Sequence, residues 1–209
     1  MLVREIMKTP VTTISPDTTF LEACKLLQEK GIRHLPVMEN GILAGVITDR
    51  DVRFATSALC PSPQQGSDPV RSAMSASVVT ADPSDPIEEA ARVMRAQKIG
   101  CLPVVEDRSV VGIITNMDLL DALLRLAGVY DSTGRLEVSL DDVPGELARL
   151  TSFFGHRNVN IRSVLTYPNG QGLIRTVLRV DTNQTLPLAE ALREAQFTVL
   201  WPMPKPWLR

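Results

Sequence analysis

Two segments of the sequence follow the same pattern, 67 residues apart and without a gap. Residues 4–52 align with residues 71–119, and 16 of the 49 aligned positions are identical. Composition alone gives about one match in fifteen. Such a repeat predicts two copies of one structural unit. A unit of about 50 residues buries too little surface to be secure alone, so we expect the two copies to pack together.

Each copy reads as the element order β-α-β-β-α. A short strand leads through a proline into a helix whose apolar residues, such as Phe20, Ala23 and Leu27, recur at helical spacing. Two strands follow, and Asn40-Gly41 between the first pair is typical of a hairpin turn. A second helix then begins after a threonine. The expected strands are 11–14, 35–38 and 43–47 in the first copy, and 78–81, 102–105 and 110–114 in the second.

A third pattern starts after Gly128, where the repeat stops. Leu136, Val138 and Leu140 alternate with polar neighbours, as in a half-buried strand. Residues 141–147 are expected to open a helix with acidic residues at its positive end and Pro144 in its first turn. The order βαββαβ is the ferredoxin-like plan. The remaining ranges are a strand at 159–165, a turn at 168–170, a strand at 173–180, a helix at 186–195 and a strand at 197–200.

The predicted fold class is therefore α/β (α+β), with two repeated domains and a third, ferredoxin-like one. The stretch between the copies is rich in Pro, Gly and Ser, which marks a linker. The predicted boundaries are domain 1 at 1–60, linker 61–69, domain 2 at 70–127, domain 3 at 133–201 and a tail at 202–209.

The residues quoted so far resemble known families. The Leu-Pro-Val strand and the Gly-x-x-Thr-x-x-Asp turn, each present twice in one register, resemble a tandem pair of CBS domains, a Bateman module. That resemblance implies a pseudo-twofold pair and a homodimer. Asp-Val-Pro-Gly-Glu-Leu followed by Asn-Val-Asn-Ile is similar to the ACT domain. The whole chain resembles the acetoin-utilisation accessory proteins of the AcuB type, which implies a pathway association.

The central site residues are two Thr–Asp corners, Thr48 with Asp51 and Thr115 with Asp118. One interpretation is a capping box, in which the acid reaches back to the backbone amide at the start of the helix. The other is a nucleotide site, because a helix start attracts phosphate and a carboxylate accepts from vicinal ribose hydroxyls. The resemblance to CBS domains implies the second use, and the two are compatible.

Cations surround the first corner but not the second. Arg33, Arg50 and Arg53 align with Gly100, Met117 and Leu120. A guanidinium is suited to holding phosphate, and solvated surface charge is the alternative interpretation. The hypothesis is that one site accepts a phosphorylated ligand well while the other is weak, empty or nucleoside-like. The resemblance also implies that backbone of the other copy's first strand contacts adenine, through Thr12, Thr13, Val79 and Thr80.

In the third domain, Asp142, Gly145 and Asn160 match positions near the effector site of amino-acid-binding ACT domains. An acidic helix start, a glycine in the first turn and an asparagine leaving a loop explain the same residues without a ligand. Pairing between two such domains is an equal expectation. An amino acid is therefore one of two alternatives here.

Composition excludes several other classes. The net charge of −2 gives no basic surplus for nucleic acid. No apolar run is long enough for a membrane span, and Glu5 falls where a signal peptide would be apolar. The cysteines, Cys24, Cys60 and Cys101, are widely spaced and suggest reduced thiols in a cytoplasmic protein. Cys101 aligns with His34, but a buried thiol is the simpler interpretation of that pair.

We expect no enzyme, no metal site and no required cofactor, because no catalytic or metal-binding motif is present. The leading interpretation is a regulatory protein whose CBS pair binds AMP, ADP or ATP, with AMP or ATP favoured. Binding would shift the packing of the two copies, and the ACT-like domain would transmit that shift. The alternative is a scaffold with empty clefts that dimerises or docks a metabolic enzyme.

Overall fold

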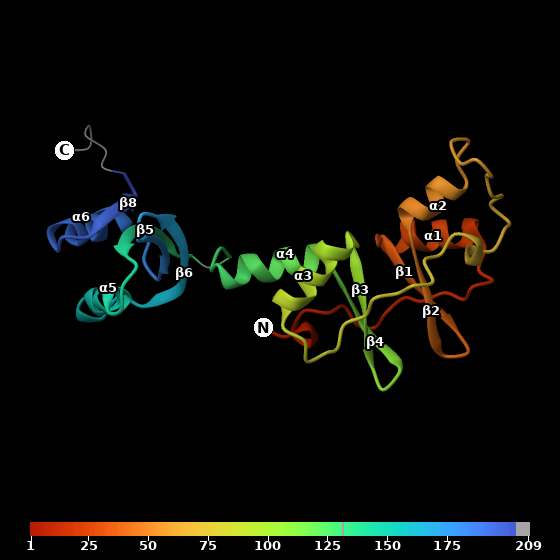
Figure 1. Ribbon diagram of the computed structural model, residues 1–209, viewed down its shortest axis with the longest axis horizontal. Helices are drawn as coiled ribbons and strands as arrows, with labels where there is room; N and C mark the ends of the chain where they lie inside the picture. Colours follow the sequence, from red (N-terminus) through yellow and green to blue (C-terminus); the bar gives the residue numbers. More distant parts are fainter. Residues whose placement is uncertain (131, 204–209) are drawn as a thin grey trace. The chain divides into compact units, whose positions relative to one another are not determined.

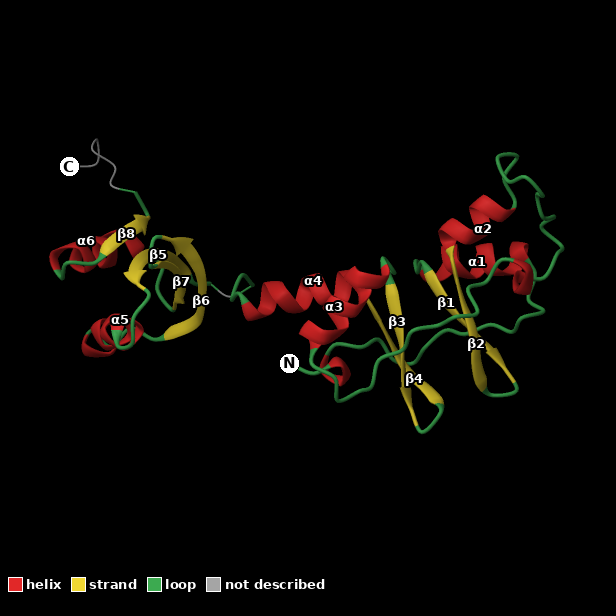
Figure 2. Ribbon diagram, in the orientation of Figure 1, coloured by secondary structure: helices red, strands yellow, loops and turns green. Residues whose placement is uncertain are grey.

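The computed structural model describes residues 1–130 and 132–203 and divides into two compact units, Met1–Leu120 and Asp121–Arg209. Every strand pair in the named sheets is antiparallel, and helices pack against the sheets (Figure 2). The predicted mixed α/β class is confirmed. The predicted tail, 202–209, lies outside the described residues from residue 204 onward.

The first repeat forms around one hairpin. Its elements are α1 (Phe20–Lys30), β1 (His34–Glu39), β2 (Ile42–Thr48) and α2 (Asp49–Ala55). The hairpin turns at Asn40 and Gly41, whose φ values of 50° and 79° are the left-handed backbone that the Asn-Gly signal predicts. The expected strand at 11–14 is reduced to a single parallel bridge from Ile14 to Val37.

The second repeat reproduces this plan. Its elements are α3 (Ile87–Gln97), β3 (Cys101–Glu106), β4 (Ser109–Thr115) and α4 (Asn116–Leu126). A bulge interrupts both hairpins at equivalent places, between Val37 and Met38 and between Val104 and Val105. The expected strand at 78–81 is again one bridge, from Ala81 to Val104. The similarity of sequence is therefore a similarity of backbone, down to an irregularity in the ladder.

The first residues of each copy, 1–8 and their counterparts 68–75, contact the other copy and are called here the exchanged segments. Lys8 pairs with Ile113 on β4, and its counterpart Ser75 pairs with Val46 on β2. The short 3-10 helix η1 (Val3–Glu5) lies on the second repeat, where Val3 N donates to Asp85 O at 2.9 Å. Its counterpart η2 (Val70–Ser72) lies on the first repeat in the same way. Figure 1 shows the N-terminal segment running beside β4 before the chain continues to α1.

Two glycines let the exchanged segments lie close to the hairpins. A Cβ on Gly45 would lie 2.8 Å from Met74 Sδ and 3.0 Å from Ser75 O. A Cβ on Gly112 would collide with Met7 Sδ and lie 3.1 Å from Met7 Cβ. Such distances are shorter than real Cβ contacts, so both positions exclude larger residues. The repeated glycine thus marks the contact between the two repeats.

The exchanged segments also contribute to the hydrophobic cores. Val70, which precedes the second repeat, is fully buried in the core of the first. Its counterpart Val3 is fully buried as well. Neither repeat therefore completes its core from its own residues, as the small size of each unit predicts. Other members of the first core include Phe20, Ala23, Leu27, Leu35, Val37, Ile47 and Val52.

The second unit contains a four-stranded sheet with strand order β6-β7-β5-β8. This is the ferredoxin-like order, and it confirms the predicted βαββαβ plan. Leu136, Val138 and Leu140 point from β5 into a core shared with Phe153 and Phe154. The bounds are β5 (Gly134–Asp141), α5 (Glu146–His156), β6 (Ile161–Gly170), β7 (Leu173–Val180), α6 (Thr185–Glu194) and β8 (Thr198–Trp201).

Two local predictions in this unit were wrong. The helix expected from residue 141 begins at Glu146, because Gly145 is the N-cap with φ 100° and Pro144 precedes it. The turn expected at 168–170 lies further on, since β6 continues to Gly170. Gln171 and Gly172, with φ values of 55° and 71°, turn the chain instead.

Candidate functional site

The first Thr–Asp corner is a closed capping box at the start of α2. Thr48 donates to Asp51 Oδ2 through its backbone N at 2.9 Å and through its hydroxyl at 2.7 Å. Asp51 N donates back to Thr48 Oγ1 at 3.2 Å. The sequence places Thr at the N-cap and the acid three residues on, which is the spacing this geometry needs. The capping interpretation is therefore confirmed.

The second corner has the same geometry at the start of α4. Thr115 donates to Asp118 Oδ2 at 2.8 Å from its backbone N and at 2.6 Å from its hydroxyl. Asp118 N donates to Thr115 Oγ1 at 3.4 Å. In both corners, the threonine proton and one carboxylate oxygen are already used. What remains for a ligand is the other carboxylate oxygen, Oδ1, which can accept from ribose hydroxyls.

That remaining oxygen differs between the repeats. Asp118 Oδ1 lies 3.5 Å from Lys8 Nζ, and the Asp118 side chain is only 7% exposed. Among the described residues, no cation is paired with Oδ1 of Asp51, which is half-buried. Lys8 reaches the second corner from the exchanged segment at the start of the first repeat. Sequence reasoning missed it, although the unequal charge of Lys8 and its counterpart Ser75 was visible.

A cavity of about 240 Å³ opens beside Asp51. Residues of α2, of the stretch between the copies and of the end of η2 with the residue after it form its wall. Its volume lies below the usual range for ligand pockets, about 300–1,000 Å³. The first corner therefore borders a hollow that is smaller than an ordinary ligand pocket. The lining residues are Asp51, Phe54, Ala55, Cys60, Ser62, Gln64, Ser72 and Ala73.

The other predicted nucleotide ligands lie outside that lining. Arg33 is brought to the first corner through its backbone, because Asp49 N donates to Arg33 O at 3.0 Å. Arg50 is exposed on the first turn of α2. Thr13 and Thr80 are exposed next to Ile14 and Ala81, which bridge to their own repeats. The residues that cross between repeats come earlier in the chain, at Lys8 and Ser75.

The arginine missing from the second repeat has a steric explanation. Gly100 stands where the first repeat has Arg33, and a Cβ there would lie 2.8 Å from His34 Nε2. His34 therefore reaches from β1 to the second repeat and occupies the space. Burial lowers the pKa of His34, an effect that Asp49 and Asp51 oppose. The imidazole is neutral at neutral pH and does not replace the lost cation.

Cys101 is the counterpart of His34 and is chemically quiet. It is 7% exposed, and burial raises the pKa of its thiol to about 12. A thiol needs a lowered pKa and access to be a nucleophile. The geometry thus agrees with the simple interpretation of a buried cysteine.

The three candidate effector residues of the ACT-like unit are not brought together. Asp142 and Gly145 follow β5, at the end of the sheet where Asp141 pairs with Leu173. Asn160 precedes β6 at the opposite end, where Ile161 pairs with Val180. Its backbone N donates to Asp181 Oδ1 at 3.1 Å. A single chain therefore does not form one site from all three.

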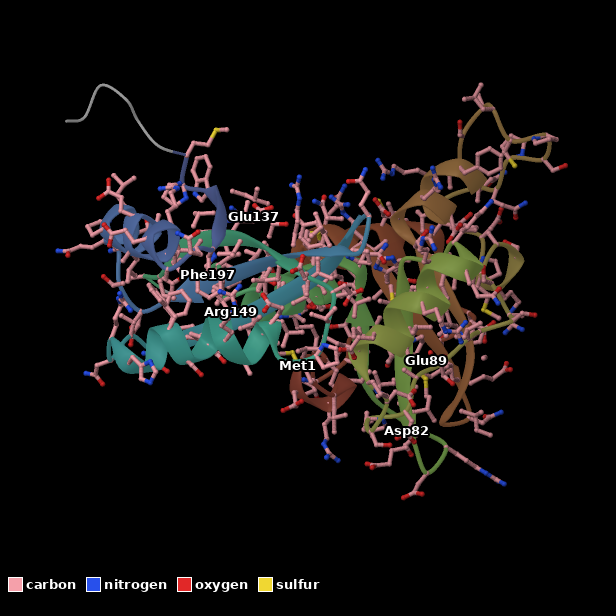
Figure 3. The ribbon with its side chains drawn as sticks, turned by 60° about the vertical axis from the view of Figure 1, so that its left-hand side comes forward. Met1, Asp82, Glu89, Glu137, Arg149 and Phe197 are labelled. Carbon is pink, nitrogen blue, oxygen red and sulfur yellow. The ribbon has the colours of Figure 1, made fainter. Side chains whose placement is uncertain are left out.

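A second cavity, of about 200 Å³, lies beside the start of α5. Arg149 lines it, donates to Glu146 Oε2 at 2.7 Å and lies over the Phe197 ring, 3.9 Å from the ring centre (Figure 3). A hydrogen bond from Arg149 lowers the pKa of Glu146. The lining is Ser139, Leu140, Asp141, Glu146, Arg149, Leu173, Gln196 and Thr198.

A carboxylate on β5 is enclosed by cations. Glu137 is 7% exposed and accepts from Arg135 at 2.7 Å, from Tyr167 at 3.1 Å and from Arg175 at 3.3 Å. The hydrogen bond from Arg135 is the main reason that the pKa of Glu137 is lowered. All these side chains satisfy one another, so the cluster is a structural network within the sheet.

The described residues contain neither a membrane-spanning helix nor a metal site. No helix among them is long and apolar enough to cross a bilayer. Within the same residues, no group of His, Cys, Asp or Glu side chains has the arrangement of a metal site.

Comparison with known proteins decides the family. The CBS domain family matches residues 3–57 and 70–125, which is more than half of the chain. The chain belongs to the CBS-domain proteins. The ACT domain family matches residues 134–196. The predicted tandem CBS pair with a C-terminal ACT domain is therefore confirmed, and both kinds of domain are regulatory modules.

Relatives and solved structures are similar over the CBS pair. The CBS domain-containing protein YhcV of Bacillus subtilis is 36% identical over 117 residues, covering 56% of this chain and 81% of YhcV. The CBS pair of MJ0100, solved with 5′-methylthioadenosine and S-adenosylmethionine, is 33% identical with a TM-score of 0.53, covering 59% of this chain and 95% of that one. A candidate acetoin utilization protein (AcuB) of Vibrio cholerae is 30% identical with a TM-score of 0.53, covering 62% and 94%.

Proposed function

We propose that this protein is a regulatory sensor whose CBS pair binds an adenine nucleotide, AMP or ATP, at the Thr–Asp corners. It has no catalytic role of its own in this proposal. The nucleotide is a regulatory ligand rather than a required cofactor. A link to acetoin utilisation, suggested by the AcuB relative, is part of the same proposal.

One observation carries the proposal. The cap uses Asp51 Oδ2 and leaves Oδ1 without a partner among the described residues, and Asp51 also lines a cavity of about 240 Å³. A carboxylate oxygen held in this way accepts well from two vicinal hydroxyls. In this proposal the phosphate meets Arg50, on the first turn of α2, and Arg33, whose backbone O accepts from Asp49 N. The adenosine ligands of the related MJ0100 pair support this choice of ligand class.

Isothermal titration of the full chain with adenosine, AMP, ATP and S-adenosylmethionine tests the proposal. We expect Asp51→Ala to weaken nucleotide binding at least about tenfold, because a hydrogen bond to a charged group is worth about 1.5–3 kcal/mol. Glu22→Ala is the matched control, since Glu22 closes the same kind of capping box on α1 with Thr19. Equal, unchanged binding by both variants contradicts the proposal.

A scaffold or homodimer role is the second candidate, favoured by a separate observation. Met117 and Leu120 lie on α4 with exposed fractions of 62% and 47%. Exposed apolar stripes of this kind mark interaction surfaces. We expect Leu120→Arg, which restores the charge found at Arg53, to shift sedimentation equilibrium toward monomer. A chain that is monomeric before mutation contradicts the homodimer.

An amino acid effector in the ACT unit belongs to the proposal as a separate ligand. The cavity beside α5 offers the carboxylate of Asp141 and the guanidinium of Arg149, which suit a zwitterion. Titration with a panel of amino acids, repeated with Arg149→Ala, tests this expectation. Binding that does not depend on Arg149 contradicts this location.

A further inference from the structure

The second corner has a cation that its own repeat does not encode. Gly100 and Met117 stand where the first repeat has Arg33 and Arg50. Lys8 Nζ nevertheless lies 3.5 Å from Asp118 Oδ1. The positive charge at this corner therefore comes from the start of the first repeat.

The backbone fixes where Lys8 lies. Lys8 N donates to Ile113 O at 2.8 Å, and Ile113 N donates to Lys8 O at 3.1 Å. Ile113 is on β4, the strand that ends at Thr115 of the second corner. Ser75 makes the same two bonds with Val46 in the first repeat but carries no charge. At the second corner the cation is Lys8 and the uncharged residue is Met117. At the first corner their counterparts are the uncharged Ser75 and the cation Arg50.

The two side chains of the ion pair differ in how exposed they are and in how firmly they are held. Asp118 is 7% exposed, with Oδ2 held by Thr115, whereas the Lys8 side chain is 72% exposed. The Lys8 ammonium is on the exposed side of the pair, so water can solvate it when it leaves Asp118 and it can change partner. Ribose hydroxyls that donate to Asp118 Oδ1 would release the ammonium within reach of the phosphate on the same ribose. A lysine ammonium holds phosphate as a point charge.

We propose that Lys8 holds the phosphate of a nucleotide bound at the Asp118 corner. The second cleft is then built from both repeats and accepts phosphorylated ligands, in place of the weak or nucleoside-like site that the missing arginines suggested. This inference rests on the proposed function, because it needs a nucleotide at the corner.

The test isolates the second cleft in the full chain. Asp51→Ala removes the first corner's ribose contact, and Asp51→Asn supplies the same background if the alanine variant does not fold. In that background we expect Lys8→Ser to weaken AMP binding about tenfold in isothermal titration and adenosine binding less than twofold. Lys8→Arg should retain AMP binding. Lys30→Ser, an exposed lysine at the end of α1, controls for net charge.

The other outcomes overturn the role of Lys8. Tighter binding of both ligands after Lys8→Ser would mean that Lys8 blocks Asp118 instead of holding phosphate. Equal weakening of both ligands would mean a structural role, and unchanged AMP binding would mean none. No binding by the unmutated chain would overturn the proposed function itself, which separates the two failures.

Discussion

The two repeats share a backbone and a Thr–Asp corner but differ in how charge reaches that corner. The first repeat carries arginines of its own at positions 33 and 50. The second repeat lacks both arginines, and Lys8 of the first repeat pairs with its Asp118 instead. His34 fills the space above Gly100, so the second repeat could not keep an arginine there without moving the imidazole. The difference teaches that the sequences of the two repeats diverge where one repeat contacts the other: Lys8 brings a cation to the second corner, and His34 takes the space beside Gly100.

The exchange of segments gives the largest expected effect. Gly112→Ala places a Cβ against Met7 Sδ and Cγ, the latter at 2.9 Å, so the N-terminal segment must shift. We expect the free energy of unfolding to fall by about 2–3 kcal/mol in urea titration. Met7→Ala in the same chain should recover part of that loss. Gly66→Ala, where a Cβ has ordinary contact at 3.7 Å, is the control and should change little.

Whether Arg50 supplies the positive charge in the first cleft can be tested by replacing it with the residue that the second repeat has there. Arg50→Met introduces the residue that the second repeat has at this position. We expect AMP binding to weaken about tenfold, with adenosine unaffected, because one charge-assisted hydrogen bond is lost. Isothermal titration measures both ligands. Arg53→Leu is the matched control, since Arg53 is already paired with Asp49 and should matter less; equal losses in the two variants would remove the distinction between the clefts.

The contact between His34 and Gly100 can be measured by a double-mutant cycle. Gly100→Ala brings a Cβ within 2.8 Å of Nε2, but the end of the ring can move. We expect a loss of about 1 kcal/mol in the free energy of unfolding. That loss should vanish in a His34→Ala background. If the two changes are additive, the histidine does not fill the space.

The smallest effect is a dependence of stability on pH. Burial is the main reason that the pKa of His34 is lowered, with Arg33 adding to it and Asp49 and Asp51 opposing it. The unfolded chain therefore binds a proton near the ordinary pKa of about 6.5 while the folded chain resists it. Stability should fall as the pH drops below about 6.5, and level off once the pH is below the lowered pKa of the folded histidine. His34→Gln should flatten that part of the thermal-unfolding profile, and an unchanged profile would contradict the assignment.

Local signals predicted most of the fold. The Asn-Gly turn, the spacing of Thr48 and Asp51 and the apolar alternation of β5 each depend on residues close in sequence, and each is confirmed. The start of α5 was predicted too early, because Gly145 takes a left-handed conformation that acidic residues and a proline do not signal.

Contacts between distant residues were harder to predict. A repeat shows that Lys8 corresponds to Ser75, but not which hairpin each residue contacts. The ion pair with Asp118 depends on that choice. Asn160 was grouped with Asp142 and Gly145 from short motifs, whereas the register of β5, β6 and β7 puts them at opposite ends of the sheet. Such placements follow from tertiary structure alone.

Val3 and Val70 are each buried against the other repeat, and this has a consequence for how the gene can change. Each half of the duplication depends on a strip encoded in the other, so neither half could be excised, swapped or inherited alone without leaving a hole in its neighbour. A substitution at Val3 or Lys8 would be felt in the later half of the module, so selection would act on the two halves together.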